Sequence, residues 1–70
     1  MKNNVELYRK KYKLTQEELA IKLGVSRQTI HSIESEKYQP SIVLAFKLSK
    51  LFHVTIEELF EFQEKEKPST

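Results

Sequence analysis

The sequence predicts an all-α fold, in which one small domain is built from five short helices. Three observations support this class. The 70 residues include one glycine and two prolines, a composition that favours helices joined by short connections. Apolar residues recur at the three- and four-residue spacing of a helix with one buried face. Four Ser or Thr residues occupy positions typical of helix N-caps, and two of the four begin a capping box.

Each expected helix begins near a polar capping residue or a turn and carries one apolar face. Thr15 and Thr55 begin the capping boxes, in which the glutamate three residues later can bond back to the cap. Ser26 and Ser41 are simpler caps, and Gly24 stands where the second helix needs a left-handed C-cap. The five helices are expected at about residues 4–12, 16–23, 27–35, 42–52 and 56–60.

One domain accounts for nearly the whole chain. Residues 1–62 are expected to form it, and residues 63–70, QEKEKPST, are expected to be a polar C-terminal tail. The best candidate for a strand is the short segment LFHVTI at residues 51–56. The aromatic residues at helical spacing are expected in the core, and they are Tyr8, Tyr12, Phe46, Phe52 and Phe60.

The composition limits the setting of the protein. There is no cysteine, so neither a disulfide nor a thiolate zinc site is available. No apolar run approaches the roughly 18 residues of a membrane span. The first ten residues, MKNNVELYRK, lack the apolar region of a secretory signal. We therefore expect a cytoplasmic protein that does not associate with a membrane.

The formal net charge is only +2, but the charge is unevenly distributed. Residues 1–13 hold five basic side chains against Glu6 alone, a local charge of +4. Residues 61–70 hold three glutamates against two lysines, a local charge of −1. A basic front and an acidic end are compatible with a polyanion bound on one face. An ordinary solvated surface explains the same charges equally well.

The segment LGVSRQTIHSIE, residues 23–34, separates two kinds of side chain when it is placed on a helix at about 100° per residue. Ile30, Ile33 and Glu34 fall on one side, which is expected to face the protein. The other side is expected to face outward, and it carries Arg27, Gln28, His31 and Ser32. Such a set of side chains is unusual for a surface that binds no ligand.

Arg27 and Gln28 suit the recognition of bases. An arginine can donate two parallel hydrogen bonds to guanine, and a glutamine can bond adenine in a similar two-point manner. Both stand in the first turn, the part of a major-groove helix that lies closest to the bases. The second helix, the turn at Gly24 and the third helix would form a helix-turn-helix. Spacing alone leaves a plain αα-hairpin that binds no nucleic acid as an equal alternative.

Residues 14–41, LTQEELAIKLGVSRQTIHSIESEKYQPS, closely resemble the core of the Cro/phage-repressor-like (Xre) helix-turn-helix family. The combination of TQEELA, GVSRQTI, IE and PS in register carries the resemblance. It extends to Arg9 upstream and to VLAFKL and VTIEELF downstream, and so covers residues 4–60. The resemblance implies a compact five-helix, repressor-like DNA-binding domain whose third helix reads the major groove.

The resemblance also implies which residues contact DNA. Arg27, Gln28 and Ser32 match base-facing positions. His31 lies on the same face, within reach of a base or a phosphate. Gln16 matches a residue that contacts a phosphate and can brace the first recognition side chain. The positions that match phosphate contacts are Thr15, Gln16, Ser26, Lys37, Tyr38, Gln39 and Ser41.

Arg9 and Glu34 match a partly buried ion pair that joins the first and third helices, which is a structural role. Three residues depart from the pattern. Glu36 stands where the family often has glycine, so either its side chain points away from the phosphates or the loop takes another shape. Lys13 occupies the usual glycine position after the first helix, where a left-handed turn would be strained. His31 replaces a commoner small polar residue.

Other chemistry has little support. His31 and His53 are the only histidines and stand 22 residues apart without cysteines, so a metal site is not expected. The glutamate pairs at 17–18 and 57–58 lie in first helical turns, where negative charge favours the helix dipole. No serine has a histidine–carboxylate arrangement, and a single glycine cannot build a phosphate-cradling loop. We expect no catalytic residue, no metal and no cofactor.

The leading hypothesis is a sequence-specific, double-stranded-DNA-binding transcriptional regulator, and a repressor rather than an activator. We expect a homodimer, because one recognition helix covers few base pairs and a two-fold dimer spans two half-sites. Leu7, Ile21 and Phe62 lie off the predicted apolar faces, as scattered exposed apolar residues commonly do. The candidate interface is Phe60, Phe62 and LFHV at residues 51–54. The alternative is an antitoxin-like or adaptor module that binds a protein partner on the same scaffold.

Overall fold

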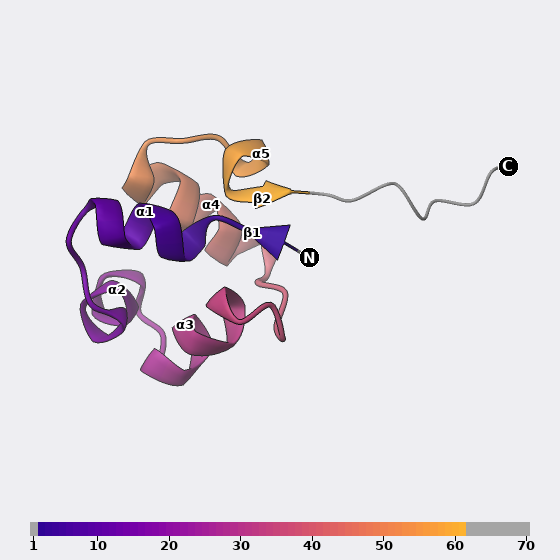
Figure 1. The fold of residues 1–70 in the computed structure, drawn as a ribbon. Coiled ribbons are helices and arrows are strands. Elements are labelled where there is room, and N and C mark those ends of the chain that lie inside the picture. The colour runs from indigo at the N-terminus through magenta and orange to yellow at the C-terminus, as the bar shows by residue number, and fades with distance from the viewer. Residues whose placement is uncertain (1, 62–70) are drawn as a thin grey trace, which may run out of the picture.

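Five helices and one short strand pair make up residues 2–61, the part of the chain that this computed structural model describes (Figure 1). The predicted all-α class is confirmed, and no helix in residues 2–61 is long and apolar enough to cross a membrane. In chain order the elements are β1 (Lys2–Asn3), α1 (Val5–Lys11), α2 (Gln16–Leu23), α3 (Arg27–Glu34), α4 (Ile42–Phe52), α5 (Ile56–Leu59) and β2 (Phe60–Glu61).

The strand pair is not predicted by the sequence. β1 and β2 run antiparallel, with Lys2 opposite Glu61 and Asn3 opposite Phe60. Two residues are too few for a strand's alternation to be seen. LFHVTI, the most strand-like segment, forms no strand: it holds the end of α4, a turn and the first residue of α5, as the predicted helix bounds require. The expected domain end after residue 62, and Phe62 itself, lie outside the described residues.

The core lies where α1, α2, α3 and α4 meet, with α5 closing it beside α4. α2 packs on α3, while α1 contacts both α3 and α4. Each helix contributes at least one buried apolar residue. The buried core residues are Val5, Leu19, Ala20, Leu23, Ile30, Ile33, Leu44, Leu48, Phe52 and Leu59.

The aromatic residues divide between core and surface. Phe52 is buried, with the Tyr8 and Tyr12 rings centred 5.9 and 5.4 Å from its own. The expectation that Tyr12 and Phe46 are core residues is wrong, since they are 46% and 51% exposed. The Tyr12 hydroxyl donates to the Phe52 carbonyl at 3.0 Å, which holds that ring at the rim. Phe46 lies on the face of α4 opposite its buried residues.

All four predicted N-caps form. The Thr15 and Thr55 hydroxyls accept from the amides three residues later, and the glutamates there bond back, so both capping boxes are complete. The Ser26 and Ser41 hydroxyls accept from the amides of Thr29 and Leu44. The helix starts are therefore determined by local sequence.

Each of the first four helices is followed by a residue in the left-handed conformation. The residues are Lys13, Gly24, Glu36 and His53, with φ between 58° and 73°. In each turn the next amide donates back to a carbonyl near the helix end, as from Lys37 to Ser32 at 3.0 Å. Only one of the four is glycine, so the other three place a Cβ in a conformation that L residues disfavour.

Candidate nucleic-acid interface

α2, the turn at Gly24 and α3 form a helix-turn-helix unit. Gly24 adopts the expected left-handed conformation, with φ 73° and ψ 33°. α3 begins after Ser26 and has no acidic residue in its first turn. Ile30 and Ile33 are fully buried against the core, which fixes how the helix is rotated about its axis. The opposite face of α3 is left at the surface.

That outer face carries the four predicted base-contacting residues. Arg27, Gln28 and His31 are exposed, and Ser32 is half-buried. The Gln28 amide donates to the Ser32 hydroxyl at 3.4 Å, a long hydrogen bond within one helical turn. The structure therefore places the Arg27 guanidinium and the Gln28 carboxamide on adjacent residues at the surface, where each can make two hydrogen bonds to a ligand.

The α3–α4 loop, residues 35–41, continues from the end of α3. Lys37, Tyr38 and Gln39 are exposed along it, and Ser41 is exposed while it caps α4. Glu36 has a φ of 67°, so the loop keeps a left-handed turn at the position where glycine is expected. Glu36 therefore combines a left-handed backbone with an exposed carboxylate.

The remaining predicted phosphate contacts lie at helix starts. Thr15 and Ser26 are exposed N-caps of α2 and α3. Gln16 is half-buried, and its side-chain amide donates to Glu34 Oε1 at 3.0 Å. Gln16 therefore braces a carboxylate on α3 rather than one of the outward side chains.

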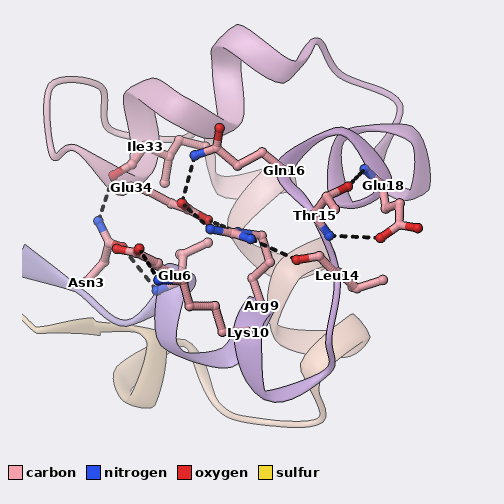
Figure 2. A network of polar contacts seen from close by, with 11 residues as sticks. Asn3, Glu6, Arg9, Lys10, Leu14, Thr15, Gln16, Glu18, Ile33 and Glu34 are labelled. Carbon is pink, nitrogen blue, oxygen red and sulfur yellow. Dashed lines mark hydrogen bonds and ion pairs between the residues drawn. The ribbon is translucent and has the colours of Figure 1, made fainter.

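Arg9 and Glu34 form an ion pair between α1 and α3 (Figure 2). Arg9 donates through Nε to Oε2 at 2.7 Å and through Nη2 to Oε1 at 3.2 Å. Its Nη1 donates to the Leu14 carbonyl at 2.8 Å. The side chains are only 10% and 5% exposed. The hydrogen bond that Arg9 donates to Glu34 raises the pKa of Arg9 although burial opposes the charge, so the guanidinium stays ionised.

Asn3 makes a contact that the sequence does not predict. Its side-chain amide donates to the Ile33 carbonyl at 2.9 Å, and its Oδ1 accepts from the Val5 amide at 3.1 Å. Figure 2 shows the side chain reaching from β1 to the end of α3. No motif signals this contact, because it joins residues 30 positions apart.

An apolar surface lies on the first half of α4. Ile42, Val43 and Phe46 are 68%, 61% and 51% exposed. Beside them is a groove of about 320 Å³, lined by Gln39, Pro40, Ile42, Ala45, Ile56 and Phe60. The expected surface at residues 51–54 is wrong, since Phe52 is buried and its neighbours Leu51 and Val54 are half-buried.

The two histidines lie apart, His31 on α3 and His53 after α4. Within residues 2–61, no cluster of three or more acidic or histidine side chains is arranged to hold a metal ion.

Comparison with known proteins identifies similar sequences over nearly the whole chain. The model of the helix-turn-helix family HTH_3 matches residues 5–59. An HTH-type transcriptional regulator of Methanocaldococcus jannaschii is 56% identical over 66 residues, which are 94% of this chain and 100% of that protein. Another, from Archaeoglobus fulgidus, is 47% identical over 66 residues, which are 94% of each chain.

Two solved structures share the fold. The restriction-modification controller protein C.AhdI from Aeromonas hydrophila has a TM-score of 0.73 and 28% identity, over 81% of this chain and 86% of that one. The SOS-response transcriptional repressor LexA from Eubacterium rectale has a TM-score of 0.77 and 25% identity, over 96% of this chain and 71% of that one.

Proposed function

Since the chain belongs to the helix-turn-helix family of DNA-binding transcriptional regulators, we propose that it is a sequence-specific repressor that reads the major groove with α3. The same membership makes it a regulator and not an enzyme. α3 is called the recognition helix from here on.

The outer face of the recognition helix is the observation that carries the proposal. Arg27, Gln28 and His31 are exposed on a helix whose opposite side is fully buried at Ile30 and Ile33. Two-point hydrogen bonding from the Arg27 guanidinium to guanine and from the Gln28 carboxamide to adenine would supply most of the base readout. Ser32 and His31 would add secondary contacts.

The phosphate contacts would flank this face. Lys37, Tyr38 and Gln39 on the α3–α4 loop are exposed, as are the capping hydroxyl residues Thr15, Ser26 and Ser41. Such contacts orient the protein on the duplex without reading its sequence. Because each neutralised phosphate releases counterions, the affinity should fall steeply as salt is raised.

Repression requires only that the protein occupies its site and blocks other proteins. The similar structure of LexA is that of an SOS-response transcriptional repressor. The described residues fold around one core and expose the outer face of α3, and binding through that face would suffice for occupancy.

A homodimer would form through the apolar surface on α4. Ile42, Val43 and Phe46 lie together on that helix and are mostly exposed. A two-fold dimer would place two recognition helices about one helical turn of DNA apart, roughly 34 Å. The enriched DNA sites should then be palindromic.

Selection of bound sites from random duplexes tests the proposal. We expect one palindromic site that is bound about 10³-fold or more tightly than scrambled duplexes. Arg27→Ala should lose most of this preference. Lys50→Ala, which removes the same charge from an exposed position on α4, is the matched control and should retain it. Duplex binding that is absent or insensitive to salt would overturn the proposal and favour a protein-binding module.

A further inference from the structure

The strand β1 contacts both the end of the recognition helix and the C-terminal elements. Asn3 donates to the Ile33 carbonyl on α3 at 2.9 Å. The next residue, Asn4, donates its backbone amide to the Leu59 carbonyl at 2.7 Å and its side-chain amide to the Glu58 carbonyl at 2.9 Å. Two adjacent asparagines therefore make the same kind of hydrogen bond to two different helices.

The Ile33 carbonyl stands at the start of the α3–α4 loop. It accepts two hydrogen bonds, one from the amide of Glu36 at 3.0 Å and one from Asn3. The Glu36 bond closes the left-handed turn that leads directly into Lys37 and Tyr38. Asn3 thus holds the carbonyl on which that turn is built.

Asn3 also lies beneath the loop. Asn3, Phe60 and loop residues 36–40 line a pocket of about 120 Å³ that is partly open to solvent. The position of the loop is set by hydrogen bonds at its two ends, together with those that the amides of Lys37 and Tyr38 donate to the Ser32 carbonyl at 3.0 and 3.2 Å. One end is the turn at Ile33 and the other is the cap at Ser41.

We propose that Asn3 is a positioning residue for DNA binding, which orders the α3–α4 loop so that Lys37 meets a phosphate. This inference rests on the proposed function. A loop that is held in place before binding loses less conformational freedom when the complex forms. Without the donor of Asn3, the turn at Glu36 would keep its backbone hydrogen bonds but lose the side-chain bond that ties it to β1.

Paired substitutions test this role. Asn3→Asp keeps the acceptor for the Val5 amide and loses the donor to Ile33, whereas Asn4→Asp loses the matching donor to Glu58. Both add the same charge to the same segment. We expect Asn3→Asp to weaken binding about fivefold to tenfold on selected and scrambled duplexes alike, as the loss of one hydrogen bond would. The affinity of Asn4→Asp for the same duplexes should stay within about twofold of that of the wild type.

A double-mutant cycle separates positioning from general destabilisation. If Asn3 acts through Lys37, the Asn3→Asp substitution should have little further effect on affinity in a Lys37→Ala background. Asn3→Ser and Asn4→Ser repeat the comparison without added charge, should an aspartate prevent folding. Equal losses for the two positions, or full additivity with Lys37→Ala, would overturn the inference while wild-type binding remained intact. A wild type that binds no duplex would remove the proposed function and this inference together.

Discussion

Arg9 on α1 and Glu34 on the recognition helix are joined by two hydrogen bonds of 2.7 and 3.2 Å in a nearly solvent-free site. The carboxylate accepts a third bond, from Gln16 on α2, and the guanidinium reaches the Leu14 carbonyl. One charged pair therefore ties the recognition helix to both helices that precede it. Its geometry fixes the angle at which Arg27 and Gln28 are presented.

Breaking this pair should be costly. Glu34→Gln leaves the guanidinium of Arg9 buried without its counter-charge, and we expect the free energy of unfolding to fall by about 3–5 kcal/mol. Urea unfolding followed by circular dichroism measures the change. Glu6→Gln is the matched control, because the Glu6–Lys10 pair is 2.9 Å long but more than half exposed. It should change stability little, and equal losses in the two variants would show that the buried pair is not special.

Substitutions at a proposed base-contacting residue and at a proposed phosphate-contacting residue should change the affinity for DNA in different ways. Arg27→Ala is expected to cost about 1–3 kcal/mol on the selected site and to relax the preference there. Lys37→Ala should weaken selected and scrambled duplexes similarly and reduce the salt slope by about one. Fluorescence anisotropy titrations at several salt concentrations give both quantities. An unchanged site preference in Arg27→Ala would refute the readout assignment.

Glu36 combines backbone strain with an unfavourable charge, and two substitutions divide these effects. Glu36→Gly relieves the left-handed strain at φ 67° and should raise the free energy of unfolding by about 0.5–1 kcal/mol. Glu36→Gln keeps the strain and should leave stability nearly unchanged. Both substitutions should strengthen DNA binding if Lys37 and Tyr38 contact phosphates as proposed, since each removes a negative charge next to these residues. Stabilisation by glutamine as large as that by glycine would mean that the charge dominates.

The α4 surface can be tested by placing a charge in it. Phe46→Asp is expected to weaken self-association about tenfold or more, because an aspartate would have to be desolvated at the interface. Sedimentation equilibrium measures the dissociation constant. Leu7→Asp, at a residue of α1 that is 60% exposed, serves as the control and should leave it unchanged. If both Phe46→Asp and Leu7→Asp remain dimeric, the interface lies elsewhere.

Features that depend on local sequence were predictable. The caps at Thr15, Ser26, Ser41 and Thr55 form, since each requires only neighbouring residues. The inward face of the recognition helix was predictable for the same reason, because one polar side and one apolar side leave a single way to pack it.

Features that depend on distant contacts were not. Residues 42–52, IVLAFKLSKLF, carry apolar residues on most sides, so periodicity alone could not show that Phe46 would face outward. The β1–β2 pairing and the Asn3 contact join opposite ends of the chain, and no spacing rule connects them. Gln16 was assigned to DNA by resemblance, whereas its bond to Glu34 required the three helices to be in place.

The β1–β2 ladder has a kinetic consequence. Pairing position 2 with position 61 closes a loop of nearly the whole described chain, so it gains its enthalpy only after the helices have assembled. Such long-range pairings of few residues are expected to open first in local unfolding. Because Asn3 stands in this ladder, each opening of the ladder would also release its hydrogen bond to the Ile33 carbonyl at the end of α3.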